Sequence, residues 1–273
     1  MATVRVNDVR LRYETAGSGG PPVVFVHGSW GDHHNWDLVA PEVARSNRVV
    51  TYDRRGHSES ERPDGQGSVH EDVADLAALI EALDLAPAHV VGNSFGAIIS
   101  LHLAAERPEL IRTLFVHEPP LFPLLAGNPE MAPILEAVAQ RIGGVVQRLQ
   151  DGDMTGGARQ FVEEVGLGPG AWAQLPPEVQ QTFITNAPTF LDESRDPDAF
   201  AFDLSTLSGF DRPTLLSQGD QSPPMFGPIV EVVAKALPAV SRHTFHGAGH
   251  VPHMSHPADY LKTLASFTEK TSP

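Results

Sequence analysis

The chain of 273 residues is long enough for one large α/β domain, or for a core domain that carries a smaller insertion. Its formal net charge of -15 disfavours nucleic acid and anionic membrane surfaces as partners. The absence of cysteine excludes disulfides, thiolate metal sites and a cysteine nucleophile. Because the sequence has no apolar run typical of a signal peptide or a membrane span, we expect a soluble, cytoplasmic protein.

The pattern of the chain predicts an α/β sheet. Residues 3–16 form two alternating runs joined at Asn7 and Asp8, which is typical of a β-hairpin. Strand-like apolar runs separated by helical patterns then occupy residues 22–28, 48–56, 88–94, 111–120, 213–220 and 241–250. This alternation indicates a doubly wound, mostly parallel sheet, in which functional groups gather beyond the carboxyl ends of the strands.

The alternation is interrupted between residues 121 and 207, where helical segments punctuated by glycine and proline occur without a convincing strand. An insertion that leaves the sheet after one strand and returns before the next would cover the carboxyl ends of the strands. We therefore expect a core of residues 1–120 and 208–273 with a helical cap of residues 121–207. A packed helical extension without a role in substrate binding is the alternative.

A glycine turn follows the first predicted parallel strand, in the stretch VVFVHGSWG. Gly28 permits a tight turn after His27 that exposes the next backbone amides. Ser29 is therefore a candidate donor to an oxyanion, with Trp30 next in line. An ordinary turn is the alternative.

Ser94 lies between two glycines in HVVGNSFGAII, after an apolar run and before a helical pattern. This context is typical of a nucleophile elbow, where small residues two positions before and after the serine allow close backbone approach. The amide of Phe95 would then face the oxyanion together with that of Ser29. Serine at this position indicates acyl chemistry through an ester-linked intermediate, whereas a Gly-rich loop is the alternative.

Five histidines gather in the stretch HTFHGAGHVPHMSHP near the end of the chain. Their spacing suits zinc only on a continuous helix, which the glycines and prolines of this stretch forbid, and no carboxylate lies within it. We therefore expect no metal ion. His250 follows a predicted strand and a Gly-Ala-Gly turn, so it is the candidate base for Ser94.

The elbow around Ser94, the His27-Gly28 turn, the stretch YDRRGHSES and the late GAGH resemble, in type and order, the α/β-hydrolase family. The resemblance covers the chain outside the cap. It implies an eight-stranded, mostly parallel sheet, the order serine, acid, histidine along the chain, and hydrolysis without a cofactor. In this family the YDRRGHS stretch is usually a structural loop, so Asp53, Arg54 and His57 receive no catalytic role.

The acid of the triad departs from the usual pattern of that family, in which an aspartate stands three residues after a glycine. Here Ser222 stands three residues after Gly219, and Asp220 comes two positions early. Glu118, at the end of the preceding strand in LFVHEPP, resembles the acid of fungal zearalenone lactonases, which use a similar His-Glu-x-Pro stretch. We favour Glu118 and keep Asp220 as the alternative.

These features predict a serine hydrolase that cleaves a carboxylic ester or lactone of a mostly apolar small molecule. Trp30, together with Trp172, Phe183 and Phe190 of the cap, is expected to line the substrate pocket, although aromatic residues are core residues as often. Carbon-carbon bond hydrolysis, cofactor-free oxygenation and a slow-turnover ligand receptor are the alternative functions on the same scaffold. The expected partner is the small-molecule substrate, and a homodimer is left open.

Overall fold

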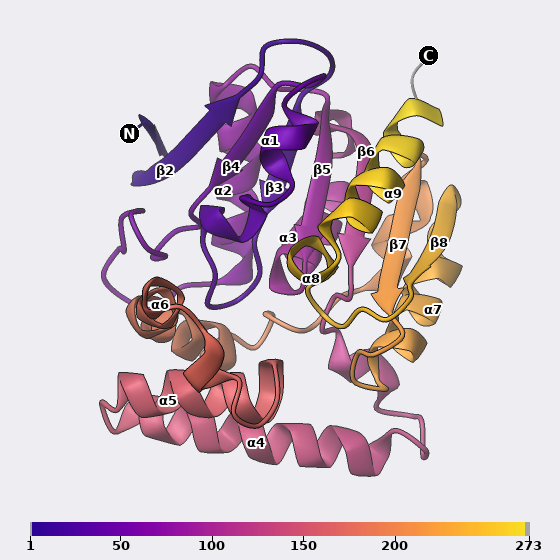
Figure 1. The fold of residues 1–273 in the computed structure, drawn as a ribbon. Helices are drawn as coiled ribbons and strands as arrows, with labels where there is room; N and C mark the ends of the chain where they lie inside the picture. Colours follow the sequence, from indigo (N-terminus) through magenta and orange to yellow (C-terminus); the bar gives the residue numbers. More distant parts are fainter. Residues whose placement is uncertain (1, 271–273) are drawn as a thin grey trace.

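The computed structural model describes residues 2–270, and eight strands form one sheet in the order β1-β2-β4-β3-β5-β6-β7-β8 (Figure 1). The strands are β1 (Ala2–Val6), β2 (Val9–Ala16), β3 (Val23–Val26), β4 (Val49–Tyr52), β5 (Ala88–Asn93), β6 (Ile111–His117), β7 (Thr214–Gly219) and β8 (Val240–Phe245). Strand β2 pairs antiparallel with β1 and β4, and the other neighbours are parallel. The expected eight-stranded, mostly parallel α/β fold is confirmed.

The hairpin of β1 and β2 turns at Asn7 and Asp8, which have φ values of 44° and 63°. Two successive residues with positive φ match the right-handed twist of the flanking strands, and asparagine and aspartate tolerate this conformation better than most side chains. The sequence therefore predicts this turn by its residue types as well as by the alternation around it.

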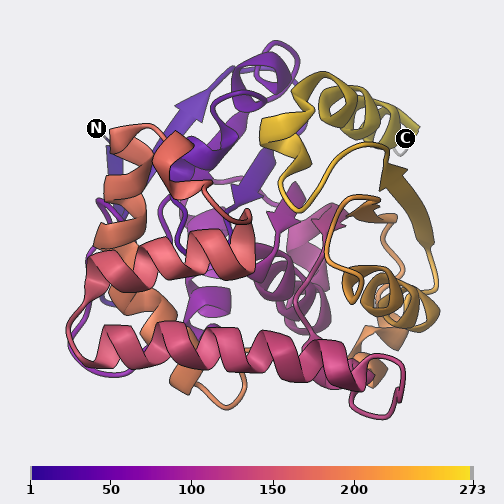
Figure 2. The ribbon, with the colours of Figure 1, turned by 60° about the horizontal axis from the view of Figure 1, so that its bottom comes forward.

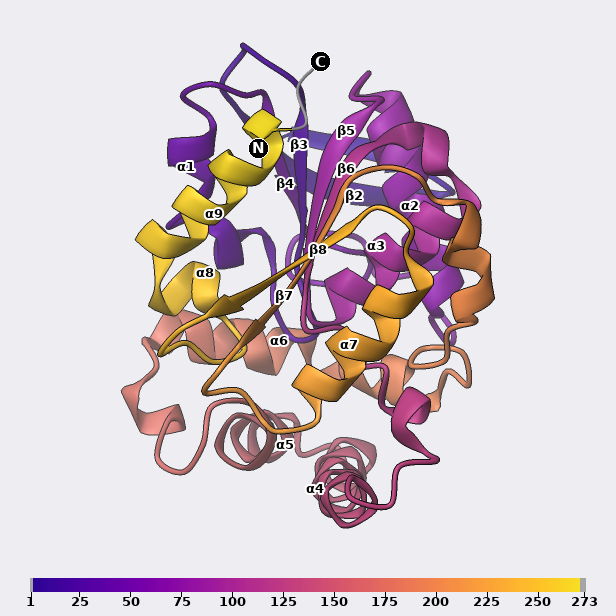
Figure 3. The same cartoon turned by 90° about the vertical axis from the view of Figure 1, so that its right-hand side faces the viewer.

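Helices cover both faces of the sheet, as the view along its edge shows (Figure 3). The helices are α1 (Ala40–Val43), α2 (Val69–Ala82), α3 (Phe95–Glu106), α4 (Ala132–Gln150), α5 (Met154–Phe161), α6 (Pro177–Arg195), α7 (Phe226–Ala236), α8 (Pro252–Ser255) and α9 (Pro257–Lys270). One apolar core lies between the sheet and α2, α3 and α7, and a smaller one lies under α9 on the opposite face. Within residues 2–270, no helix combines the length and the apolar character that a membrane span requires.

The segment between β6 and β7 is helical, with no strand among its described residues. Its helices α4, α5 and α6 lie beyond the end of the sheet toward which the parallel strands point (Figures 1 and 2). We call residues 121–207 the cap. A third apolar cluster, formed mainly by cap residues, includes Trp30 from the loop after β3. The cap therefore packs onto a loop at the carboxyl ends of the strands.

Several histidines are buried as neutral groups. Burial lowers the pKa of His27 and His253 to about 3, and it lowers the pKa of His89 and His117 to about 4. In the unfolded chain these side chains titrate near about 6.5. Between these limits the unfolded state binds more protons than the native state, so acidification favours unfolding.

We therefore expect thermal stability to fall as the pH decreases from 7 to 5. His33 opposes this trend: burial alone would lower its pKa, but the hydrogen bond and charge of Asp53 raise it overall. The pKa is lowered in seven histidines, the four above together with His57, His102 and His243, and raised only in His33. We therefore expect Tm to drop by more than about 5 °C, at roughly 2–4 °C per kcal/mol for a chain of this size. Differential scanning calorimetry across this range measures the effect, and a constant or rising Tm would contradict it.

Candidate active site

Ser94 occupies a strained turn between β5 and α3, with φ 57° and ψ -123°. A Cβ atom at Gly92 would lie 2.4 Å from the carbonyl oxygen of Gly96, and one at Gly96 would lie 2.2 Å from that of Val26. Both positions therefore require glycine. The geometry is that of the elbow expected from the sequence, and it places Ser94 at the carboxyl end of a central strand.

The loop after β3 lies against Ser94. A Cβ atom at Gly28 would come within 2.9 Å of the Ser94 Cβ atom and 3.5 Å of its Oγ atom. The next amide belongs to Ser29, and Phe95 provides an amide in the first turn of α3, where amides have no partner within the helix. These two amides remain our proposed oxyanion donors.

His250 and Glu118 are in direct contact. The Nδ1 atom of His250 lies 2.6 Å from Oε2 of Glu118, whose side chain is fully buried. The second carboxylate oxygen, Oε1, accepts a hydrogen bond of 2.7 Å from the amide of Gly219. The side-chain amide of Asn93, next to Ser94, donates to the carbonyl oxygen of His250 over 2.9 Å. The residue before Ser94 is thus bonded to the backbone of His250, whose ring contacts Glu118, beyond the carboxyl ends of the parallel strands.

A local distortion brings Glu118 to this position from the neighbouring strand. Glu118 directly follows β6 and has a φ of 46°, a left-handed conformation that is rare for glutamate. Its own amide remains bonded to the carbonyl oxygen of Ser217 in β7 at 3.1 Å. Its side chain reaches across the end of β7 to the loop that follows β8.

The surroundings of Glu118 keep it ionised. Burial alone would raise the pKa of Glu118, but the hydrogen bond with His250 is the largest of the effects that lower it overall. Burial itself lowers the pKa of His117 to about 4, so this histidine is neutral near pH 7. His250 is then the neighbour whose Nδ1–H group faces the Glu118 carboxylate. A catalytic base is oriented in this way.

Asp220, the alternative acid, is turned away from His250. One of its carboxylate oxygens lies 3.0 Å from Nδ1 of the exposed His246, and the other accepts a hydrogen bond of 2.8 Å from the amide of Gly247. Asp220 therefore fastens the loop after β8 at the surface. The side chain that contacts His250 is Glu118, and its catalytic role remains a proposal.

The other histidines of the C-terminal stretch are dispersed. The ring of His253 is buried against Trp36, with 4.4 Å between centroids, whereas His246 is exposed beside Asp220. Within residues 2–270, His250 alone among these histidines belongs to a cluster with metal-ligand spacing, and that cluster is the contact with Glu118 and His117.

The aromatic residues expected in a pocket form a packed cluster instead of an open wall. Trp30 is fully buried, and its ring lies 4.8 Å from that of Phe190 and 6.0 Å from that of Phe183. Phe190 is also buried, while Phe183 and Trp172 are half-buried at the edge of the cluster. Trp30 and Phe190 thus join the cap to the loop that carries Ser29.

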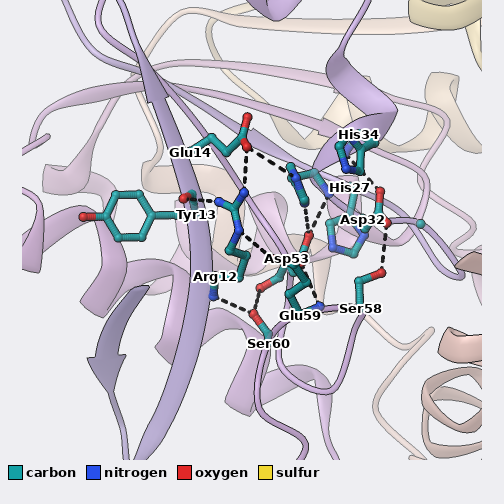
Figure 4. A network of polar contacts seen from close by, with 12 residues as sticks. Arg12, Tyr13, Glu14, His27, Asp32, His34, Asp53, Ser58, Glu59 and Ser60 are labelled. Atoms are coloured by element: carbon teal, nitrogen blue, oxygen red, sulfur yellow. Dashed lines mark hydrogen bonds and ion pairs between the residues drawn. The ribbon is translucent and has the colours of Figure 1, made fainter. Parts of the chain in front are cut away.

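The stretch after β4 forms a polar network without contact to Ser94 (Figure 4). The carboxylate of Asp53 accepts hydrogen bonds from the amides of His33 and Glu59, and the amide of Arg12 donates to Ser60. These contacts fix the loops after β3 and β4 to each other and to β2. They agree with a structural role for Asp53.

The sequence model of one protein family, described as the alpha/beta hydrolase family, matches residues 23–263 of the chain. The chain belongs to this family. It is 38% identical over 130 residues to the uncharacterized hydrolase YraK of Bacillus subtilis strain 168, which is 46% of this chain and 47% of that protein. The chain spans about half or less of the length of the curated relatives it matches.

Two solved structures show how widely the chemistry of this alpha/beta hydrolase fold varies. Est816, described as an N-acyl homoserine lactone degrading enzyme, has a TM-score of 0.75 and 23% identity, covering 97% of this chain and all 100% of its own. An epoxide hydrolase of Bacillus megaterium has a TM-score of 0.80 and 21% identity, covering 98% of this chain and 100% of its own. Both likenesses show the fold alone, so the substrate class must be argued from the site.

Sequence reasoning missed Phe226 of this alpha/beta hydrolase. Phe226 begins α7, and its ring stacks on that of His250 with 4.7 Å between centroids and 20° between planes. The stacked ring covers one face of the imidazole and restricts its rotation. No local sequence pattern marks Phe226, because its relevance depends on where the loop after β8 places His250.

The first prediction for the site concerns the acid. Glu118→Gln should reduce kcat on the order of 10⁴-fold, because the amide cannot hold the Nδ1 proton or stabilise the imidazolium. Asp220→Asn should change kcat less than about tenfold, since Asp220 contacts only the surface loop. Steady-state kinetics of both variants, with Tm as a check on folding, measure the difference. The reverse ranking would return the role of the acid to Asp220.

The second prediction concerns the approach of the loop to the nucleophile. Gly28→Ala should lower kcat on the order of 100-fold, because the new methyl group would displace Ser94 or the Ser29 amide. Gly143→Ala in α4 is the matched control, since no atom lies within 4 Å of its new Cβ. It should keep full activity and gain about 1 kcal/mol of stability. Equal activity of the two variants would contradict the placement of the loop.

Proposed function

We propose that this alpha/beta hydrolase is a serine hydrolase that cleaves carboxylic esters or lactones of small, mostly apolar molecules through an acyl-enzyme. The observation that carries the proposal is the contact of 2.6 Å between Glu118 and His250, at the strand ends beside Ser94. A buried carboxylate on Nδ1 leaves Nε2 of the ring to accept the proton of a serine.

The proposed reaction proceeds in two halves. Oγ of Ser94 attacks the carbonyl carbon while His250 takes its proton, and the amides of Ser29 and Phe95 hold the oxyanion. Collapse of the tetrahedral intermediate breaks the bond to the alkoxy oxygen, which receives the proton from His250. Water, deprotonated by His250, then attacks the acyl-enzyme and releases the acid and free Ser94. With a lactone, the leaving hydroxyl stays attached to the acyl chain.

The type of nucleophile and the net charge bear on the substrate of the proposed reaction. Serine as the nucleophile argues against displacement at an epoxide or halide, which would leave an alkyl ether that water cannot cleave through an oxyanion. A hollow of about 540 Å³ lies where cap residues 163–169 meet Gln221, Ser222 and Pro223 after β7. Arg141, Glu163 and Glu164 line it together with apolar residues, and Ser94, Glu118 and His250 do not, so it carries no argument about the substrate. The net charge of -15 disfavours strongly anionic substrates.

The proposal predicts that Ser94→Ala folds normally yet loses several orders of magnitude in activity, because only binding and oxyanion contributions remain. Turnover is measured with p-nitrophenyl esters of increasing acyl length and with acyl homoserine lactones. A fluorophosphonate should label Ser94 of the unmodified protein and leave the alanine variant unlabelled. A labelled residue elsewhere would refute the nucleophile, and a single slow burst in place of steady turnover would indicate a receptor.

A further inference from the structure

The side chain of Ser29 contacts the cap through Glu193. Oγ of Ser29 donates a hydrogen bond of 2.5 Å to Oε2 of Glu193, which lies near the end of α6. Only 5% of the Glu193 side chain is exposed. A buried carboxylate of the cap therefore holds the residue whose amide is a proposed oxyanion donor.

Arg54 connects this carboxylate to the second proposed donor. Its Nη2 atom lies 2.9 Å from Oε1 of Glu193, and its guanidinium carbon lies 4.7 Å from the centroid of the Phe95 ring. Its Nη1 atom reaches the carbonyl oxygen of Gly28 at 3.4 Å. On the far side, Nη2 contacts the carboxylate of Asp72 in α2 at 2.9 Å. One buried cation thus contacts the carbonyl oxygen of Gly28, next to the Ser29 amide, and the ring of Phe95, whose amide is the other proposed donor.

Two other buried side chains of α6 lie on the same helical face as Glu193, at intervals of three and four residues. Asn186 donates to the carbonyl oxygen of Gly31 at 2.8 Å, and the hydroxyl of Thr189 lies 2.9 Å from Nε2 of His57. These contacts also fix the cap to the core. The hydrogen bonds of Thr189 join it to His57 and Asn186, and none of them reaches Ser29, Arg54 or Phe95. Thr189 is therefore a matched comparison for Glu193.

We infer that Glu193 is a positioning residue: through Ser29 and Arg54 it fixes the two oxyanion-donor segments, so that the oxyanion site is complete only while α6 is docked. The inference rests on the proposed function, because it assigns a role within the acyl-transfer reaction. Glu193 itself touches neither Ser94 nor His250 in the structure's hydrogen bonds.

Electrostatics make this contact specific to the docked helix. Burial raises the pKa of Glu193 overall, and the charge of Arg54 and the hydrogen bond from Ser29 offset only part of this effect. A buried carboxylate that loses its cation pays a large desolvation penalty, and so does the cation that loses its carboxylate. The docked arrangement satisfies both charges together with Asp72, whereas a displaced α6 leaves Arg54 with one carboxylate fewer.

Donors aimed at the oxyanion act in the transition state, when the carbonyl oxygen becomes negative. Loosening them should therefore lower kcat and leave KM nearly unchanged. We expect Glu193→Gln to lower kcat between about tenfold and 100-fold with less than about threefold change in KM. The affinity for a trifluoromethyl ketone, which forms the tetrahedral oxyanion on Ser94, should fall in parallel with kcat.

Thr189→Val is the control, because it removes a buried hydrogen bond of the same helix without touching Ser29 or Arg54. We expect it to lower Tm as much as Glu193→Gln does while kcat stays within about threefold of the unmodified protein. Ser29→Ala keeps the backbone amide and removes only the hydroxyl, so it should lower kcat in the same direction even if the Glu193 variant folds poorly. Equal losses of kcat in the Thr189 and Glu193 variants would overturn the inference.

Hydrogen exchange separates this inference from the proposed function. Amides in peptides that cover residues 24–36 and 92–100 should exchange faster in Glu193→Gln than in Thr189→Val, whether or not a substrate has been found. Unchanged exchange in these peptides would overturn the positioning role. The unmodified protein could show neither turnover nor labelling of Ser94, while the Glu193 variant still exchanges faster. This result would refute the proposed function and leave the positioning of the loop standing.

Discussion

The hydrogen bond between Glu118 and His250 joins parts of the site that come from the ends of four adjacent strands. Ser94 follows β5, Glu118 follows β6, Gly219 ends β7, and His250 follows β8. A fully buried carboxylate is tolerated only when its charge is matched, and the donors here are the Gly219 amide and the His250 ring. The position of His250 thus depends on the register of all four strands.

Backbone strain at the two strand ends is part of this arrangement. Ser94 and Glu118 both have positive φ, a conformation that costs on the order of 1–3 kcal/mol for a residue with a side chain. Each is held by a hydrogen bond to the next strand, from the Ser94 amide to the carbonyl oxygen of His117 and from the Glu118 amide to that of Ser217. The packed parallel sheet therefore maintains two conformations that an isolated strand and turn would not adopt.

The sequence predicts well whatever is determined locally. The central strands β3, β4 and β5 are short and buried on both faces, so their apolar runs mark them. The elbow of Ser94 carries its steric requirements in Gly92 and Gly96. The choice between Glu118 and Asp220 was harder, since it depends on how far a side chain reaches across β7. The 2.6 Å contact of Glu118 is made from a residue with positive φ, which the residue type does not indicate. The contacts of Asp220 with His246 and Gly247 depend on the loop after β8, which the residues around Asp220 do not reveal either.

Contacts between the cap and the core were beyond sequence reasoning. Arg54 belongs to a stretch to which we gave no catalytic role, and Glu193 was one acidic residue among many on a helix with mixed polarity. Their pairing joins residues separated by 139 positions, so neither periodicity nor a motif predicts it. Trp30 illustrates the same limit, because its aromatic neighbours Phe161 and Phe190 come from two cap helices that pack on it only in the folded chain.

The core and the cap therefore contribute to different parts of the proposed reaction. The strand ends position the nucleophile, base and acid, and none of these three depends on α6 for a hydrogen bond among the contacts described above. The loop of Gly28 and Ser29, in contrast, lies between Ser94 and the cap, and Glu193, Arg54 and the cluster around Trp30 hold it from the cap side. Removal of α6 would leave the proton-transfer groups intact and weaken stabilisation of the oxyanion, which is the larger share of catalysis in acyl transfer. The buried charges at this boundary also restrict the docked position of the helix, because a shifted helix would separate Glu193 from Arg54 and leave Arg54 with Asp72 alone.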